Sequence, residues 1–173
     1  PAREGAVYDS NRYTVFGLLT RLGCEVIDMG VVSDQPEALE AAFASAALCS
    51  DAIITSGGVS VGEADYTKAM MKKLGDVAFW KIAMRPGRPM AVGQILRRNL
   101  ASSPYLSIAN SSYNNSKFNG SAVLFGLPGN PVAVMVTFLA FVRPTLLRMM
   151  GCKANAPPLL KANSLEAIRK KPG

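Results

Sequence analysis

The chain has 173 residues and a mass of 18.4 kDa, a size that fits one domain. It is 49% hydrophobic and only 18% charged, so it can bury a sizeable core and is not disordered as a whole. It has no histidine and three scattered cysteines, which excludes a zinc site, a Ser-His-Asp triad and a Cys-His catalytic pair.

The net charge of +7 is distributed unevenly along the chain. Residues 1–66 carry three basic and ten acidic side chains, whereas residues 67–98 carry eight basic and one acidic. This asymmetry favours an anionic ligand, either a nucleic acid or a smaller anion. The basic residues lie among glycine, proline and apolar segments rather than on one basic helix, so nucleic-acid binding through the basic stretch after residue 67 is the weaker alternative. Solvated surface residues would explain most of them equally well.

The apolar pattern predicts helices and strands in alternation. Helical spacing predicts helices over 11–22, 36–48 and 64–74, with Asp34 as the N-cap of the second and Gly75 at the end of the third. Apolar, β-branched runs predict strands over 24–32, 51–55, 77–83, 89–95 and 122–125. A long helix should run from Pro131 to Met150, kinked by Pro144. This alternation indicates one α/β domain, a three-layer αβα arrangement with a mostly parallel sheet.

Two segments do not fit this compact pattern. Residues 99–121 contain twelve Ser or Asn and predict a long flexible insertion between two strands. Residues 153–173 are polar and basic and predict a linker that leaves the domain. The apolar stretch Pro131–Val142 is too short to span a bilayer, and no basic-then-apolar leader opens the chain. We therefore expect neither a membrane anchor nor secretion.

A glycine-rich loop, SGGVSVG at 56–62, follows one predicted strand and precedes a predicted helix. The backbone N–H groups of such a loop can approach an anion, and the helix N-terminus adds partial positive charge. An ordinary strand–helix turn would show the same spacing. Asp65 comes just after the loop and is either a helix N-cap or a metal-binding or acid–base carboxylate beside a phosphate, and Glu63 competes with it for these roles.

Two further turns could hold an anion. Lys81 interrupts an apolar strand, and Arg85 and Arg88 lie on the turn that follows, an arrangement that suits an oxyanion. A solvated edge strand is the alternative interpretation. The GLPGNP turn at 126–131 opens the long helix, either as a second anion site or simply as a rigid start for a core helix.

Three motifs together are more specific than any one of them alone: SGGVSVGEADY at 56–66, WKIAMRPGRP at 80–89 and GLPGNP at 126–131. YDSN at 8–11 and LGCEV at 22–26 accompany them. This combination resembles the molybdopterin molybdenumtransferase family, MoeA and the gephyrin E domain, over about residues 5–150.

The resemblance implies an αβα molybdopterin-binding domain. Members of the family insert molybdate into adenylylated molybdopterin with a divalent metal, here expected to be magnesium, and release AMP and molybdenum cofactor. The resemblance implies that Asp34, Asp65, Lys81 and Arg85 are catalytic and that Asp65 is also the metal ligand, although position 85 is more often lysine in the family. The cofactor-binding residues that it implies are Ser56, Gly57, Gly58, Ser60, Gly62, Pro128, Gly129, Asn130 and Pro131.

The chain also departs from the family pattern. Family members are longer, and we expect the domain, residues 1–152, to lack the opening strand and STGDE motif ahead of Tyr8 and the β domain after the linker. As a fragment it would bind the pterin without turnover. The alternative is a non-catalytic module that binds molybdopterin or another anion, or acts as a scaffold. Pterin and molybdate are the expected partners, in the cytoplasm and without a membrane; homo-oligomerisation is left open.

Overall fold

The computed structural model describes residues 9–57, 71–97, 120–153, 158 and 160–167. In this part of the chain the sheet has four strands in the order β1-β4-β3-β2, with β1 Ala52–Ser56, β2 Gly75–Lys81, β3 Pro89–Leu96 and β4 Ser121–Leu127. β1 and β4 are parallel, whereas β2–β3 and β3–β4 are antiparallel. The predicted α/β class is confirmed. The described sheet is mixed rather than mostly parallel, because β2 and β3 form a hairpin and β4 runs against β3.

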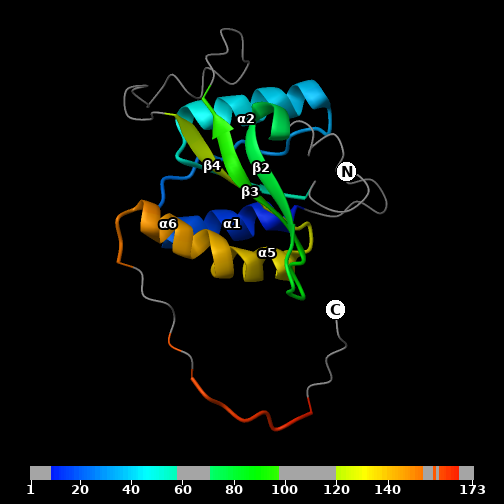
Figure 1. Cartoon of the computed structure of the whole chain (residues 1–173), viewed down its shortest axis with the longest axis vertical. Coiled ribbons are helices and arrows are strands. Elements are labelled where there is room, and N and C mark those ends of the chain that lie inside the picture. Colours follow the sequence, from blue (N-terminus) through cyan, green and yellow to red (C-terminus); the bar gives the residue numbers. More distant parts are fainter. Residues whose placement is uncertain (1–8, 58–70, 98–119, 154–157, 159, 168–173) are drawn as a thin grey trace.

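Helices cover both faces of the sheet (Figure 1). α2 (Pro36–Cys49) covers one face. The other face is covered by α1 (Ser10–Arg21) and by a continuous helix made of α5 (Pro131–Thr137), the π-helical η1 (Phe138–Val142) and α6 (Arg143–Met149). The three-layer arrangement is therefore as predicted.

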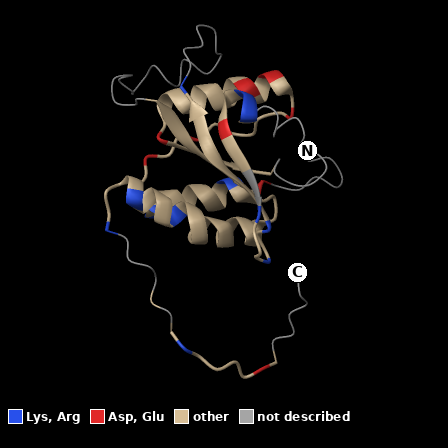
Figure 2. Ribbon diagram, viewed as in Figure 1, with Lys and Arg blue, Asp and Glu red and all other residues tan. Residues whose placement is uncertain are grey.

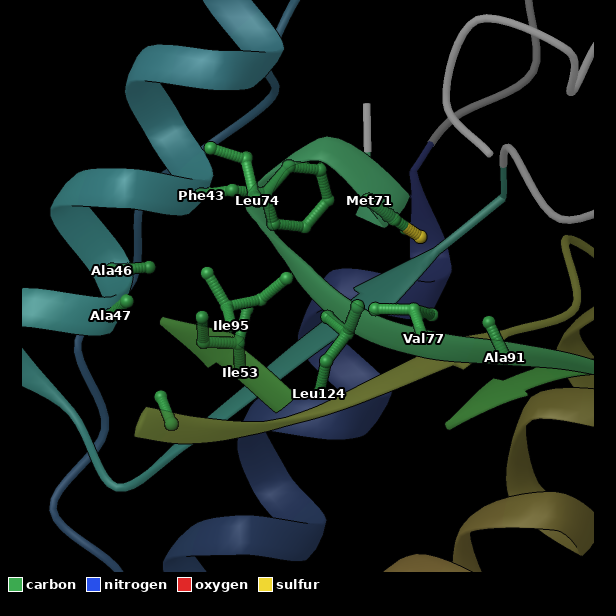
Figure 3. Packing of buried hydrophobic residues seen from close by; sticks show 11 residues of the cluster. Phe43, Ala46, Ala47, Ile53, Met71, Leu74, Val77, Ala91, Ile95 and Leu124 are labelled. Atoms are coloured by element: carbon green, nitrogen blue, oxygen red, sulfur yellow. The ribbon is translucent and has the colours of Figure 1, made fainter. Parts of the chain in front are cut away.

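Each face of the sheet has its own hydrophobic core. Beneath α2, Phe43 and Ala47 pack against Ile53, Ile95 and Leu124 of the strands (Figure 3). On the other face, the buried side chains of the long helix recur at every fourth position and meet the strands; they are Val134, Phe138, Val142 and Leu146. The side chains of β4 alternate between the two cores, as the two-residue period of a strand requires.

The helix that begins at Pro131 has close to its predicted length and extends beyond the apolar stretch Pro131–Val142. It continues through Arg143 and Pro144 to Met149, and it is long and apolar enough to cross a membrane by length and composition, with a mean hydropathy of 1.6. Pro144 does not end it, because the π turn over Phe138–Val142 loosens the helix just where proline would meet the preceding carbonyls. One side of the helix is packed on the sheet, as in the core helix of an α/β domain.

Two local predictions are wrong. Residues 24–32 form no strand, since no described strand lies beside them to complete a ladder. The N-cap of α2 is Gln35 rather than Asp34. The end of the third helix is as predicted: residues 71–74 are helical, and the helix ends at Gly75, which is not left-handed and also begins β2. A Cβ on Gly75 would lie 1.8 Å from the Gln94 carbonyl oxygen, so close strand approach explains the glycine.

Segment 24–32 is held against α1 by an ion pair. The Arg12 Nε donates to both carboxylate oxygens of Asp28 at 2.8 and 2.9 Å, and the Gly30 N–H donates to the same carboxylate at 2.9 Å. Both contacts hold the pKa of Asp28 below its ordinary value, and the hydrogen bond from the Arg12 guanidinium has a larger effect than the one from the Gly30 N–H.

The Asp28 pair makes stability depend on pH in a defined direction. Because the pKa is lower in the folded state, the contribution is complete above the ordinary value of about 3.9 and is lost as pH falls through the folded pKa. Asp28→Asn should therefore lower the melting temperature slightly at pH 7 and make no difference in strong acid. Thermal unfolding of the parent chain and of Asp28→Asn between pH 7 and strong acid tests this prediction. A difference in melting temperature that persists in strong acid would contradict it.

The predicted insertion over 99–121 lies almost wholly outside the described residues, apart from Gly120 and Ser121, of which Ser121 begins β4. The described part of the tail, from Cys152 on, contains no helix or strand and is exposed. The division into a domain over 1–152 and a linker over 153–173 stays a prediction.

Candidate functional site

The candidate site lies where the parallel strands β1 and β4 end. Ser56 is paired with Leu127 at these ends, and the Gly57 N–H donates to the Leu127 carbonyl at 3.1 Å. A Cβ placed on Gly129 would lie 3.9 Å from the Cα of Gly57. The structure therefore brings the start of the glycine-rich loop and the GLPGNP turn side by side, although they are about 70 residues apart in the sequence.

Gly57 has a φ of +85° and open space around its Cβ position, so glycine is needed here for the backbone conformation rather than for packing. The chain leaves the sheet at this point and turns toward the loop. Gly58, Ser60, Gly62 and Asp65 lie outside the described residues.

The GLPGNP turn starts the long helix in a regular way. The Asn130 Oδ1 accepts a hydrogen bond from the Ala133 N–H at 3.0 Å, and Pro131 occupies the first turn. Pro128 is buried, whereas Gly129, Asn130 and Pro131 are exposed. The rigid helix start proposed for this turn is thus observed. The same geometry leaves the positive end of the helix beside Gly57, so it is compatible with an anion site as well.

Asn11 is a candidate site residue that was not predicted from the sequence. It is 8% exposed on the first turn of α1, and its Nδ2 donates to the Gly129 carbonyl at 2.8 Å. Its Oδ1 is buried, and no described residue donates to it. Asn11 therefore ties α1 to the GLPGNP turn. The signal for it was the YDSN match at 8–11, but its partner is 118 positions away and could not be read locally.

Replacing Asn11 with alanine should lower the free energy of unfolding by about 1–3 kcal/mol, because the part-buried Gly129 carbonyl loses its donor. Ser10→Ala is the matched control: the side chain of Ser10 is exposed on the same turn, so its loss should be nearly neutral. Urea unfolding of both variants measures the difference. Equal stability of the two would show that the Asn11 contact contributes nothing.

Lys81, Arg85 and Arg88 lie on the β2–β3 hairpin (Figure 2). Lys81 pairs with Pro89 and is the last residue of β2, at the same edge of the sheet as Ser56. All three basic residues are exposed, so Lys81 carries no burial cost. Three strand spacings separate β2 from β1, about 14 Å. The basic residues and the glycine pair therefore lie at the same end of the sheet but follow different strands.

A groove of about 800 Å³ is lined by residues of α1, α2 and β1, among them Ser56, and by Gly57. Asp34 is exposed just before α2 and lines this groove as well. In Figure 1 the N-terminal ends of α1, α2 and α5 lie at one end of the molecule. Asp34 is thus at the candidate site's end of the fold, while Lys81 and Arg85 do not line this groove.

The described residues contain no group of three or more Cys, Asp or Glu side chains that could hold a metal ion. Burial raises the pKa of Cys24 and of Cys49, which keeps both thiols protonated and poorly nucleophilic at neutral pH. The chemistry of the described part is therefore that of glycine turns, helix N-termini and exposed basic side chains, which suits binding of an anionic ligand.

Comparisons with known proteins agree with this geometry. The family model described as "Probable molybdopterin binding domain" matches residues 2–148. The chain is 41% identical to the molybdopterin molybdenumtransferase of Haemophilus influenzae over 100% of its own length and 37% of that protein. It is 32% identical to gephyrin of Dictyostelium discoideum, over 86% of this chain and 21% of that one.

Among solved structures, the molybdopterin biosynthesis MoeA protein from Pyrococcus horikosii matches with a TM-score of 0.65 and 30% identity, over 89% of this chain and 32% of that one. The chain thus spans about a third, or less, of the length of these relatives. The family model covers most of the chain, and both the fold and the motifs at 56–57 and 126–131 agree with it. The chain therefore belongs to the molybdopterin-binding domain family.

Proposed function

We propose that the chain binds molybdopterin at the carboxyl ends of β1 and β4 and, within a longer protein, takes part in inserting molybdate into adenylylated molybdopterin. One observation carries the proposal: Gly57 and Gly129 lie together where parallel strands end and the helix from Pro131 begins. Ligands of α/β proteins bind at such strand ends, and phosphates bind at such helix starts. The names of the relatives, molybdopterin molybdenumtransferase and gephyrin, support the pterin as the ligand.

The separation of the site's two parts favours a long ligand. About 14 Å lies between β1 and the strand that ends in Lys81. A pterin joined to a nucleotide by phosphates extends over several groups and carries charge along its length. We place one phosphate beside Gly57 and Gly129 and a second anionic group, phosphate or molybdate, toward Lys81 and Arg85.

In this proposal each residue has one task. Lys81 and Arg85 hold an oxyanion, Asp65 acts as the acid or holds a divalent cation, and Asp34 faces the site from the start of α2. Magnesium, if bound there, would offset the negative charge that a carboxylate brings close to phosphates. Gly57, Gly129 and Asn130 orient the ligand through their backbone. Magnesium, molybdate and a cytoplasmic location stay predictions.

Lys81→Ala and Arg85→Ala should each weaken binding of molybdate or phosphate by about 1–3 kcal/mol, the scale of a charge-assisted hydrogen bond. Both side chains are exposed, so the fold should be kept. Arg148→Ala is a matched control, because this exposed basic residue lies on the last turn of α6, away from the hairpin. Titration calorimetry measures all three. If Lys81→Ala and Arg85→Ala bind molybdate or phosphate as tightly as the control does, Lys81 and Arg85 are solvated surface residues without a role in anion binding.

The experiment that tests the function is a chimera. The matching third of the Haemophilus influenzae molybdopterin molybdenumtransferase is replaced by this chain, to which it is 41% identical. We expect the chimera to bind adenylylated molybdopterin and to release AMP when molybdate and a divalent metal are added. Binding without AMP release in a folded chimera would instead favour the non-catalytic module, and no binding would contradict the proposal.

A further inference from the structure

The tip of the β2–β3 hairpin lies beside the start of the long helix (Figure 1) and contacts it through Gly87. Gly87 is buried, although the residues on either side of it are exposed. A Cβ on Gly87 would lie 2.8 Å from the Thr137 Cγ2 and 3.9 Å from the Ala133 carbonyl oxygen. The glycine backbone therefore packs directly on α5, which forms the first two turns of the long helix.

Thr137 presents a fixed methyl group to this glycine. Thr137 is the last residue of α5 and is 0% exposed. Its hydroxyl donates to the Ala133 carbonyl at 2.7 Å and lies 3.1 Å from the Val134 carbonyl. A β-branched side chain has few rotamers, and a threonine hydroxyl bonded to its own helix fixes one of them. The methyl group that faces Gly87 is therefore held in place by the helix.

Two independent features exclude a side chain at position 87. The φ of Gly87 is +107°, a conformation that residues with a Cβ rarely adopt. The space is also occupied, because an added Cβ would meet the Thr137 methyl and would lie 2.9 Å from the Met84 Cε. Met84 ends in a flexible side chain that can withdraw, whereas the Thr137 methyl is fixed. Thr137 therefore sets how closely the hairpin tip approaches the helix.

This contact lies between the two arginines of the hairpin tip. Arg85 precedes Gly87 by two residues and Arg88 follows it directly, and both arginines are exposed. The Ile82 N–H donates to the Arg88 carbonyl at 2.7 Å and closes the tip. The backbone of the arginines cannot shift relative to the helix without loss of this bond or of the contact at Gly87. The two cationic side chains thus start from a fixed place.

The same turns of the helix follow the GLPGNP turn. Asn130 caps the helix through its bond to the Ala133 N–H. At a rise of 1.5 Å per residue, Ala133 lies about 4.5 Å along the helix axis from Asn130, and Thr137 lies about 10 Å from it. In the sheet the two parts follow β4 and β2, which are separated by β3. The helix therefore acts as a short rigid spacer between the GLPGNP turn and the hairpin tip.

We propose that Gly87 and Thr137 are positioning residues. Their contact fixes Arg85 on the long helix, and so sets the distance from this arginine to the glycine turns at the ends of β1 and β4. The inference rests on the proposed function, in which one ligand carries negative groups at both places. The contact would then select ligands by the separation of their negative groups, since only a matching separation allows both parts of the site to bind at once.

The first test needs no ligand and measures amide hydrogen exchange. In Gly87→Ala the new Cβ should push the tip away from the helix, so the amide of Ile82 should exchange at least tenfold faster than in the parent chain. The internal control is the amide of Ala78, which pairs with Val92 well inside the hairpin and should be unchanged. An unchanged rate at Ile82 would overturn the proposal.

A second substitution separates the contact from backbone strain. Thr137→Ser removes the methyl that the new Cβ meets and keeps the hydroxyl that bonds the helix. Combined with Gly87→Ala, it should slow the exchange of Ile82 at least threefold relative to the single variant. Gly151→Ala is the matched control for strain, because its φ is +79° and an added Cβ there has nothing within 4 Å. Equal rates in the single and double variants would mean that strain alone acts.

The last test asks whether the contact acts through Arg85. We expect Gly87→Ala to weaken molybdate binding at least fivefold in titration calorimetry, and the added Thr137→Ser to recover at least twofold of this loss. In a chain that already carries Arg85→Ala, Gly87→Ala should weaken binding less than twofold, because the group that it positions is gone. A merely structural role would weaken binding by the same factor with and without Arg85, and that result would overturn the proposal.

Failure of this inference is distinguishable from failure of the proposed function. Molybdate binding that falls in Arg85→Ala but is unchanged in Gly87→Ala overturns the positioning role alone. A parent chain that binds no molybdate overturns the oxyanion role of Arg85 and this inference with it. Faster exchange at Ile82, together with a loss of binding that depends on Arg85, is the result that the proposal predicts.

Discussion

Replacing Phe138 with alanine is expected to lower the free energy of unfolding by about 3–5 kcal/mol, the usual cost of removing a fully buried aromatic ring. Phe138 is 0% exposed on the long helix and belongs to the core that joins this helix to β3 and β4. The neighbouring strand and helix residues are themselves buried, so they can fill only part of the space. Urea unfolding followed by circular dichroism measures the loss.

Leu139→Ala is the matched control, since Leu139 is the next residue of the same helix and is 51% exposed. Its replacement should change the free energy of unfolding by less than about 0.5 kcal/mol. The contrast tests whether this apolar helix is a core helix of the domain. Similar small losses for both variants would mean that the helix does not pack on the sheet through Phe138.

Replacing Asp65 with asparagine in the chimera is expected to lower metal-dependent AMP release by about 10²- to 10⁴-fold, the range lost with an acid–base group. Binding of the pterin should persist and, without metal, become tighter. A carboxylate beside phosphates is unfavourable until a cation or a proton offsets it, and the amide removes that charge. Steady-state AMP release and titration calorimetry measure the two effects separately.

If Asp65 is only a helix cap, asparagine caps almost as well, and stability should change by a few tenths of a kcal/mol with turnover near that of the parent. Glu63→Gln tests whether Glu63, rather than Asp65, is the acid–base or metal-binding carboxylate. Loss of AMP release in Glu63→Gln, with Asp65→Asn unaffected, would transfer the role to Glu63.

Local patterns predicted the elements whose partners lie nearby. The hairpin of β2 and β3 follows from two apolar runs and a turn rich in Pro, Gly and Arg, and α2 follows from its Ala-rich run after Pro36. Gly93 shows what a local pattern cannot give. A Cβ there would lie 2.2 Å from the Asp76 carbonyl oxygen on the partner strand, a contact that exists only once the hairpin has formed.

The failures share a physical cause, which is dependence on distant parts of the chain. Segment 24–32 has the composition of a strand, but a strand forms only beside another, and no described strand is its neighbour. In the sequence Asn11 resembles any first-turn residue of a helix. Its role depends on the hydrogen bond that it donates to the distant Gly129 carbonyl. Asp34 resembled an N-cap, yet Gln35 takes the position, so the carboxylate is left exposed beside the groove.

The most direct test of a pterin site at the ends of β1 and β4 is calorimetric titration of the chimera with molybdopterin, before and after Gly57→Val. At φ +85° any side chain strains the backbone, so the turn should move and molybdopterin should bind at least tenfold more weakly. Gly151→Val places similar strain at φ +79°, after α6, and should bind as the parent does. A folded chimera that gives no heat with molybdopterin, or a Gly57→Val variant that binds as tightly as Gly151→Val, would contradict the account.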